Sequence, residues 1–488
     1  MLLSELFLKL NGIFDEAAEF KAFGNSSLQE FSIERISSSS KDAGGRVIFA
    51  CIKGERFDGN EFINEAYDAG TRVFLTEREN LKIKSGIAII SKNARKTMAE
   101  IAKILFEVPK GAMLTVGITG TKGKSTVCEI LAKTLRTLGV KTLSVGSFGA
   151  YFEKALELKN TTPDASVLFP LIKEAYDGGA SVSVIEVSSQ ALKDSRVFGI
   201  DFDIVAFTSF GIDHVGRGEH ENLCDYISAK RSLFTSFGAS LAVINADDAY
   251  SAYFSCGVPE IIRCGSSSFA DYKIRNIVDG FFGMRFSLSG TQKSYSLPGR
   301  FNATNIAIAA AIAERITKEP LEKILEIISK IKLKGRFECY NVLSRFAIID
   351  YAHNEKSLRE MLLSIRNITK RRIITVFGSV GDRSKNRRRE LSRVASRLSD
   401  FSVITSDNPG FENPYEIAEE IYSFFEEKER AAVVVNRAEA IRYAFSKSKP
   451  GDVILLIGKG HEEYMLRGGK REKFSEREIL NRIKKEGV

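Results

Sequence analysis

The segment Gly117–Thr126 contains the residues whose types and spacing most clearly predict chemistry. It reads Gly-Ile-Thr-Gly-Thr-Lys-Gly-Lys-Ser-Thr, so backbone N–H groups at its glycines could approach phosphate oxygens, and a following helix would add positive potential. Lys124 would pair with the β- and γ-phosphates of a nucleotide, and the Ser125 hydroxyl would reach Mg²⁺. Ile118 stands where the usual GxxxxGKS/T motif has its first glycine, and a glycine-rich turn without a ligand is the alternative. The flanking strand and helix favour phosphate binding.

Glu186 and His214 could serve a metal ion beside this loop. Glu186 ends the apolar strand predicted at 182–187, and a carboxylate in that place can hold Mg²⁺ directly or through water. His214 follows another apolar strand, and its imidazole would suit a mixed oxygen and nitrogen site. Taken alone, each residue is as well explained by a capping carboxylate or an ordinary hydrogen-bonded histidine. However, His353 and His461 also follow apolar strands, and three similar placements among four histidines favour a function.

Alternating strands and helices must position these groups, and the alternation predicts an α/β fold with mainly parallel sheets. Around the glycine-rich loop we expect strands at 114–118, 181–187, 203–208 and 240–245, and helices at 125–138, 303–316 and 321–331. The apolar residues of 125–138 recur at helical spacing, and Gly139 is a suitable C-terminal stop. Residues 272–297 alternate less regularly between glycines and predict a small hairpin insertion.

A second doubly wound sheet is predicted nearer the C-terminus. Its strands are expected at 347–350, 373–377, 402–405, 432–435 and 453–457, and its helices at 358–368, 390–398, 415–425 and 438–446. Ligands of such sheets bind outside the carboxyl ends of the strands. The loops 378–383, 407–410 and 458–462 are therefore candidate binding loops.

Three domains follow from this organisation and from the length of 488 residues, since domains average about 150 residues. Residues 1–110 are predicted to form a small N-terminal α/β domain. Residues 111–336 are predicted to form a central P-loop ATPase-like domain with a parallel sheet. Residues 337–488 are predicted to form a Rossmann-like C-terminal domain.

The composition narrows the class of partner. A net charge of +9 and a pI of about 9.0 favour anions such as nucleotides, phosphorylated substrates or nucleic acid. The Lys and Arg residues are dispersed, without the basic tail or block typical of nucleic-acid-binding proteins. Six cysteines without a CxxC pair argue against a zinc ribbon and predict reduced, mostly buried thiols. There is no signal-peptide pattern and no apolar run of about 18 residues, so we expect a cytoplasmic protein without a membrane span.

The motifs together resemble the Mur ligase family, and the resemblance covers nearly the whole chain. The phosphate loop has the TGTxGKS/T form of that family. Further family-like segments, in family order, are Glu186–Ser189, Asp213-His214, Leu297–Asn305, Gly335–Glu338 and Asp350–His353. The segments that resemble the MurE type within the family are Asn160–Asp164, Asp407–Pro409 and Gly458–Glu462.

The resemblance implies an ATP-dependent, ADP-producing ligase of peptidoglycan precursor synthesis. Its expected substrates are UDP-N-acetylmuramoyl-L-alanyl-D-glutamate, bound by the N-terminal domain, and a diamino acid, bound by the C-terminal domain. ATP and Mg²⁺ would be required, and the side-chain carboxylate of D-Glu would be activated as an acyl phosphate. A monomer that binds neither nucleic acid nor a membrane is expected.

The resemblance also implies roles for individual residues. Residues expected to bind ATP are Gly120, Thr121, Lys122, Gly123, Lys124, Ser125, Thr126, Asn305, Arg336 and Asp350. Residues expected to bind the UDP-sugar dipeptide are Ser40, Thr161, Thr162, Ser188 and Arg196. Residues expected to bind the amino acid are Arg383, Asp407, Asn408, Gly410, Gly458 and Glu462. The expected catalytic residues are Lys124, Glu186, His214 and Lys230, and the expected metal ligands are Ser125, Glu186, His214 and Lys230 after carbamylation to N6-carboxylysine.

Gly410 bears on the identity of the added amino acid. By the resemblance, ligases that add meso-diaminopimelate carry an Arg there, and that Arg holds the second carboxylate. Its replacement by Gly favours L-lysine, with ornithine, lanthionine or meso-diaminopimelate as alternatives. Another Mur or folylpolyglutamate-type ligase is a further alternative. A nucleotide-binding module without ligase activity is the rival from a different class.

Overall fold

The computed structural model describes residues 1–11, 18–54, 57–211, 220–381 and 385–487. The chain divides into two compact units, one holding Met1–Lys273 and Thr304–Ile324 and the other Ile274–Ala303 and Leu325–Val488. Both contain parallel sheets with helices between the strands, which confirms the predicted α/β class. The predicted domain boundaries stay predictions.

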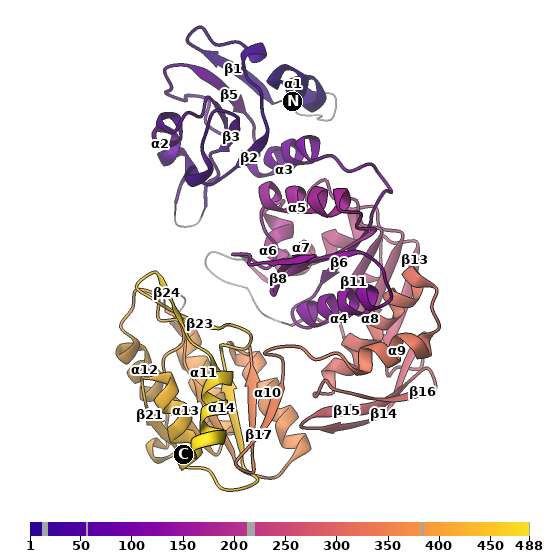
Figure 1. Ribbon diagram of the computed structural model, residues 1–488, viewed down its shortest axis with the longest axis vertical. Coiled ribbons are helices and arrows are strands. Elements are labelled where there is room, and N and C mark those ends of the chain that lie inside the picture. Colours follow the sequence, from indigo (N-terminus) through magenta and orange to yellow (C-terminus); the bar gives the residue numbers. More distant parts are fainter. Residues whose placement is uncertain (12–17, 55–56, 212–219, 382–384, 488) are drawn as a thin grey trace. The chain divides into compact units, whose positions relative to one another are not determined.

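A five-stranded sheet occupies the N-terminal part of the first unit (Figure 1). Its elements are α1 (Leu3–Asn11), β1 (Glu19–Phe23), β2 (Arg35–Ser37), β3 (Val47–Ala50), α2 (Ile63–Asp68), β4 (Val73–Thr76), β5 (Gly86–Ile90) and α3 (Ala94–Leu105). The strand order is β1-β5-β4-β3-β2, and only β1 runs antiparallel to its neighbour. Successive side chains point to opposite faces of a strand. Ile48 and Ala50 therefore pack on the face covered by α1 and α3, and Phe49 packs on the face covered by α2.

A larger sheet follows in the first unit. Its strands are β6 (Leu114–Thr119), β7 (Thr142–Gly146), β8 (Gly149–Phe152), β9 (Lys154–Leu156), β10 (Val182–Glu186), β11 (Ile204–Phe207), β12 (Leu241–Asn245) and β13 (Glu260–Gly265). Its helices are α4 (Lys124–Thr137), α5 (Ala165–Asp177), α6 (Ser189–Lys193), α7 (Leu223–Thr235) and most of α8 (Phe301–Thr317), and α9 (Leu321–Ser329) is divided between the two units after Ile324. The parallel part has the order β13-β12-β11-β6-β10-β7, so β6 lies in the middle with both faces buried. The loop after β6 thus lies beside the loops that follow β10 and β11.

Residues 272–297 were predicted as a small hairpin insertion, and the structure corrects this to three strands. They are β14 (Tyr272–Gly280), β15 (Gly283–Leu288) and β16 (Thr291–Tyr295). All three are paired antiparallel, with a register shift between Arg275 and Val278. This irregularity explains why the segment shows no clean period of two in its sequence.

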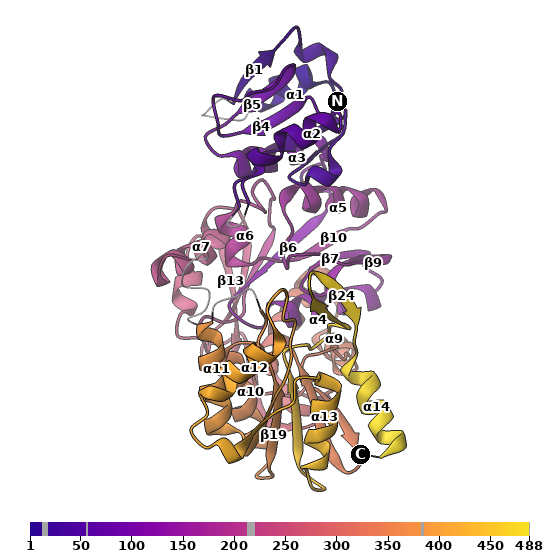
Figure 2. The ribbon, with the colours of Figure 1, turned by 90° about the vertical axis from the view of Figure 1, so that its left-hand side faces the viewer.

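The C-terminal sheet in the second unit has all five predicted strands and one more. Its strands are β17 (Glu338–Val342), β18 (Arg345–Asp350), β19 (Ile373–Phe377), β20 (Phe401–Ile404), β21 (Ala431–Val433) and β22 (Val453–Ile457). Its helices are α10 (Glu355–Ile368), α11 (Asn386–Leu398), α12 (Pro414–Ser423), α13 (Arg437–Ser446) and α14 (Glu476–Glu486). The strand order is β17-β18-β22-β19-β20-β21, and only β17 is antiparallel. Helices α10–α12 cover one face, and α13 and α14 cover the other (Figure 2).

Besides β17, the helix α14 and the hairpin of β23 (Tyr464–Arg467) and β24 (Lys470–Lys473) were not predicted in the second unit. Of the six thiols, three are buried, so "mostly buried" was too strong. Within the described ranges, no helix is both long and apolar enough to cross a membrane.

Candidate active site

The phosphate loop lies between β6 and α4, as predicted. A Cβ atom at Gly120, where φ is +148°, would collide with the Thr208 hydroxyl. A Cβ atom at Gly123, where φ is +86°, would lie 2.5 Å from Asn305 Oδ1. Only glycine therefore allows the loop to pass so close to its neighbours. The same packing brings Asn305, a predicted ATP-binding residue, beside the N-terminus of α4.

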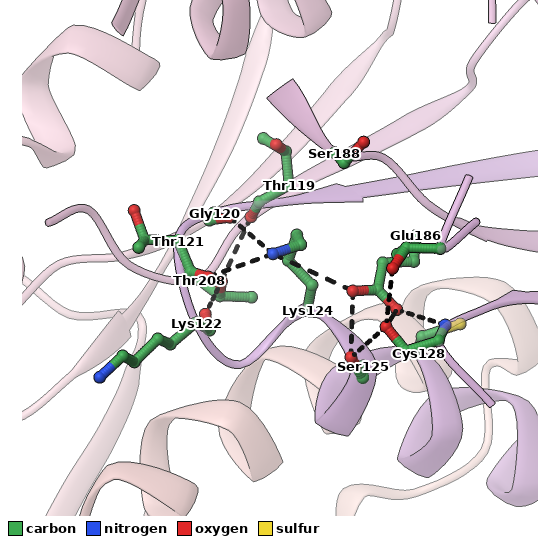
Figure 3. A network of polar contacts seen from close by, with 12 residues as sticks. Thr119, Gly120, Thr121, Lys122, Lys124, Ser125, Cys128, Glu186, Ser188 and Thr208 are labelled. Carbon is green, nitrogen blue, oxygen red and sulfur yellow. Dashed lines mark hydrogen bonds and ion pairs between the residues drawn. The ribbon is translucent and has the colours of Figure 1, made fainter. Parts of the chain in front are cut away.

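The predicted catalytic pair of Lys124 and Glu186 lies at this loop (Figure 3). Lys124 Nζ donates to the carbonyl oxygens of Gly120 (3.0 Å) and Thr121 (3.2 Å) and lies 4.0 Å from Glu186 Oε1. Ser125 Oγ donates to Glu186 Oε1 at 3.0 Å. One ammonium, one hydroxyl and one carboxylate thus meet at the start of α4, where phosphate oxygens could replace the loop carbonyls as partners of Lys124.

Ser147, which the sequence analysis did not identify, orients the Glu186 carboxylate. Glu186 is only 2% exposed, and its Oε2 accepts hydrogen bonds from Ser147 N (2.9 Å) and Ser147 Oγ (3.0 Å). Ser147 directly follows β7, which runs parallel to β10. Functional residues often follow parallel strands, and this rule would have identified Ser147 if β7 had been predicted.

The donors at this site fit Mg²⁺, which prefers hard oxygen ligands. Ser125 and Glu186 supply a hydroxyl and a carboxylate from adjacent elements. Lys230, from α7, is 1% exposed, and its Nζ donates to Gly120 O at 2.8 Å. Carbamylation of Lys230 would thus place a second carboxylate beside the loop. No group of three or more His, Cys, Asp or Glu side chains gathers in the described ranges, and Asp213 and His214 lie outside them.

Three residues predicted to contact the UDP-sugar dipeptide lie next to Glu186 or to Ser147: Thr161, Thr162 and Ser188. The Thr162 hydroxyl is fully buried, donates to Glu186 O at 2.7 Å and accepts from Ser188 N at 3.1 Å. Thr161 Oγ1 lies 3.1 Å from Ser147 Oγ. Thr162 thus fixes the backbone after β10, and its direct contact with substrate stays a prediction.

Arg196 and Ser40 complete the predicted UDP-sugar–dipeptide set. Arg196 donates to Thr162 O (3.1 Å) and pairs with Asp164 (3.2 Å) and Asp194 (2.9 Å). These contacts fix the guanidinium next to the Thr161–Asp164 loop. Ser40 begins a short 3-10 turn after β2, at the carboxyl edge of the N-terminal sheet.

In the second unit, the motifs around Gly335, Tyr351 and Gly460 meet at the carboxyl edge of the sheet. A Cβ atom at Gly335 would collide with the backbone of Gly460 and His461, and Tyr351 N donates to Gly335 O at 3.1 Å. The Arg336 guanidinium lies 5.0 Å from the centre of the Tyr351 ring. Burial raises the pKa of Tyr351 to about 12, so its hydroxyl is neutral at physiological pH.

Asp350, predicted to bind the ribose of ATP, ends β18 in this group. Its two carboxylate oxygens accept from Phe337 N and Ala352 N, both at 2.8 Å, and the residue is 7% exposed. The carboxylate therefore joins the backbone that follows Arg336 to the loop after β18. Its contact with ribose stays a prediction. Arg336 and Asp350 lie in a different unit from the phosphate loop.

The predicted amino-acid site is a buried polar cluster formed by the loops after β20 and β22. Lys459 is completely buried, and its Nζ donates to Asn408 Oδ1 (2.7 Å) and Glu462 Oε2 (2.8 Å). Asn408 Nδ2 also donates to Glu462 Oε2 at 2.8 Å. Asp407 Oδ1 lies 3.9 Å from Lys459 Nζ and accepts no hydrogen bond from the described residues. A Cβ atom at Gly458 would collide with Asp407, so glycine is required there. The cluster can thus bind an ammonium group through Asp407 and Glu462.

Lys459 was not predicted as a site residue, because sequence alone does not show that its ammonium is buried. We expect Lys459→Met to raise the KM for the amino acid about tenfold or more, since a lost charged hydrogen bond costs roughly 1.5–3 kcal/mol. The KM for ATP should stay unchanged. Initial-rate assays would measure both constants, with Lys473→Met as the control, because Lys473 is 80% exposed. An equal effect of the two variants would show that Lys459 has no special role.

Two buried arginines fix the loops of this cluster. Arg437, at the start of α13, donates to Ser406 O (3.3 Å) and Ile457 O (2.6 Å), just before the loops of Asp407 and Gly458. Arg388, on α11, pairs with Glu412 (2.6 Å) and Glu420 on the α12 side. Arg383, predicted to bind the carboxylate of the amino acid, lies outside the described residues.

One parallel sheet carries a phosphate loop, and another carries a cluster of charged residues at the carboxyl ends of its strands. This combination is typical of a nucleotide-dependent enzyme that binds a second, charged substrate. The chain belongs to the Mur ligase family. Residues 32–110 match the Mur ligase family catalytic domain, residues 118–313 the Mur ligase middle domain, and residues 335–460 the Mur ligase glutamate ligase domain. The predicted family is thereby confirmed, and the protein is an ATP-dependent, amide-bond-forming ligase.

Two relatives are named UDP-N-acetylmuramoyl-L-alanyl-D-glutamate–2,6-diaminopimelate ligase. The one from Aquifex aeolicus is 34% identical over 462 residues, covering 92% of this chain and 93% of its own. The one from Bacillus licheniformis is 34% identical over 470 residues, covering 92% and 94%. A solved structure with the same name has a TM-score of 0.65 at 24% identity and covers 97% of both chains, which supports the fold. The relatives' names favour the diaminopimelate alternative, and the predicted preference for lysine is unconfirmed.

Proposed function

We propose that the chain joins 2,6-diaminopimelate to the D-Glu side-chain carboxylate of UDP-N-acetylmuramoyl-L-alanyl-D-glutamate and converts ATP to ADP and phosphate. The names of the two relatives support these substrates. The observation that carries the chemistry is the phosphate loop, where Lys124 Nζ lies 4.0 Å from the Glu186 carboxylate and Ser125 bonds to it. The buried acidic cluster of Asp407 and Glu462 supports an amine-bearing second substrate.

In the first step, the D-Glu carboxylate and the triphosphate of ATP, which are both negatively charged, must come into contact. Lys124 and the loop N–H groups lower the repulsion between the D-Glu carboxylate and the triphosphate and stabilise charge on the γ-phosphoryl group. A carboxylate oxygen bonds to the γ-phosphorus, the bond from that phosphorus to the bridging oxygen breaks, and ADP leaves. The neutral amine then bonds to the acyl carbon, phosphate leaves, and the nitrogen gives up a proton.

Mg²⁺ is part of this proposal. Ser125 and Glu186, with Lys230 as its carbamate, would hold the ion, which would neutralise phosphate charge when bound. Ser147 orients the Glu186 carboxylate through two hydrogen bonds. We further propose that the enzyme acts as a monomer in the cytoplasm.

Lysine remains a second candidate for the added amino acid. Gly410 offers no side chain for a second carboxylate, and an ammonium alone would satisfy the Asp407–Glu462 cluster. The two candidates differ only in the carboxylate at the far end of the amino acid.

Side-by-side ligation assays test the proposal. The purified protein, given ATP, Mg²⁺ and the UDP-linked dipeptide, should release ADP in step with amide product when diaminopimelate is added. Lysine, ornithine and lanthionine are the comparison substrates. Faster product formation with lysine would overturn the choice of diaminopimelate, and ADP release without amide product would overturn the ligase reaction for these substrates.

A further inference from the structure

The hairpin β23–β24 is hydrogen-bonded to the loop that carries Asn408 and Gly410. Leu466 N donates to Asn408 Oδ1 (2.9 Å), Gly410 N donates to Leu466 O (3.2 Å), and Gly468 N donates to Gly410 O (2.7 Å). Gly410 and Arg467 are paired in a parallel bridge. Paired strands lie roughly 5 Å apart, so the backbone of Arg467 lies directly beside that of Gly410.

Both faces of β23 contact the amino-acid cluster: the face of Arg467 contacts Asn408, and on the opposite face the Tyr464 ring centre lies 5.1 Å from Lys459 Nζ. Alternate residues of a strand share a face, so Met465 and Arg467 project to the same side. Met465 is 3% exposed, and its sulfur accepts from Asn408 N at 3.2 Å. Gly410 carries no side chain, so at this bridge only Arg467 supplies one.

The Arg467 guanidinium is only loosely held where it stands. Its side chain is 43% exposed, and it lies 3.8 Å from the Glu472 carboxylate, which is 55% exposed. Ion pairs between exposed groups contribute little to stability. Turning the guanidinium from Glu472 toward a ligand would therefore cost little free energy.

The amino-acid cluster itself cannot hold a carboxylate well. Asp407 and Glu462 are two carboxylates, and Lys459 is paired with both of them. Diaminopimelate carries both an ammonium and a carboxylate on its far α-carbon, whereas lysine carries only the ammonium. The far carboxylate needs a cation close to the acidic cluster but outside it, and a guanidinium can bind a carboxylate with two parallel hydrogen bonds.

We propose that Arg467 binds the carboxylate at the far end of a diamino dicarboxylic acid and so separates this substrate from lysine. The proposal rests on the proposed function, because only a substrate with two carboxylates uses this contact. The hairpin β23–β24 is then the element that determines specificity, and the distinguishing cation is supplied by β23 next to Gly410.

Arg471 is the rival for this role. It pairs with Leu466 across the hairpin, on the face opposite Arg467, and its guanidinium lies 4.4 Å from the Tyr464 ring. Lys470, the cross-strand partner of Arg467, is exposed near the turn of the hairpin and serves as a control for loss of one positive charge.

The test compares Arg467→Gln, Arg471→Gln and Lys470→Gln with the wild-type enzyme. We expect Arg467→Gln alone to raise the KM for diaminopimelate tenfold or more, with the KM for ATP and the rate with lysine unchanged. Arg467→Lys, which keeps the charge but loses the paired hydrogen bonds, should recover part of the loss. Unchanged thermal unfolding would show that each variant is folded.

Different results separate the two proposals. If the wild type uses diaminopimelate and Arg467→Gln behaves like Lys470→Gln, the role of Arg467 is overturned while the proposed function stands. A selective loss in Arg471→Gln instead would move the contact to the other face of the hairpin and equally overturn it. If the wild type uses lysine and not diaminopimelate, both proposals fail.

Discussion

Replacement of Lys124 by alanine will lower the ligation rate by about a hundredfold to a thousandfold, because removal of one group that stabilises transition-state charge typically costs 10²–10³. Lys124 Nζ lies beside the Gly120 and Thr121 carbonyls and 4.0 Å from Glu186. Its place in the phosphate-loop motif is that of the lysine that contacts the β- and γ-phosphates. The rate of ADP release with all substrates present measures the effect.

The matched control for this prediction is Lys133→Ala. Lys133 lies on the same helix, α4; its side chain is 41% exposed, and its Nζ is 3.7 Å from Glu129. This substitution should leave the rate within about twofold, since nine residues of helix, or about 14 Å, separate Lys133 from Lys124. Circular dichroism should show both variants folded. Turnover retained by Lys124→Ala would remove that lysine from the mechanism.

Replacement of Arg437 by methionine will destabilise the second unit by about 3–5 kcal/mol, the usual cost of breaking a buried ion pair. Arg437 is 1% exposed, pairs with Glu476 at 2.8 Å and holds the ends of β20 and β22 through Ser406 and Ile457. The protein has no Trp, so urea unfolding is best followed by far-ultraviolet circular dichroism.

The Arg437→Met variant should also acquire a pH dependence. Burial raises the pKa of Glu476, and Arg437 is the group that opposes this rise. Without Arg437, the folded state will prefer a protonated Glu476, whereas the unfolded state releases that proton above about pH 4.3. Because the pKa of Glu476 is already raised in the folded wild type, the stability deficit relative to wild type should grow as the pH rises above that folded-state pKa.

Arg442→Met is the control on the same helix. Arg442 also pairs with a glutamate of α14, but at 3.8 Å from Glu486 and with both side chains exposed. We expect a change within about 0.5 kcal/mol. Equal destabilisation by the two variants would show that burial of the Arg437–Glu476 pair is not the cause. A large rise in the KM for the amino acid in Arg437→Met alone would link this pair to the binding loops.

Much of the candidate site could be predicted because its residues lie at the carboxyl ends of strands or directly after them. Lys124, Glu186, Asp350 and Asp407 were assigned to the carboxyl ends of strands or to the residues that follow them, and the structure places them there. The sequence carries this information locally, since apolar runs predict strands and the residues after them define the edge of the sheet. Ser147 was not predicted as a site residue because the strand before it, β7, was not predicted.

The sequence by itself determined the α/β class, the phosphate loop and the membership of the family, since these depend on short motifs and on local periodicity. The tertiary structure alone decided that Lys459 is buried against Asn408 and that Arg467 lies beside Gly410. Their separations along the chain exceed 50 residues, and no local pattern encodes such a contact. The physical reason is that burial and charge pairing depend on which strand ends the fold brings together, and this is set by the packing of the whole sheet.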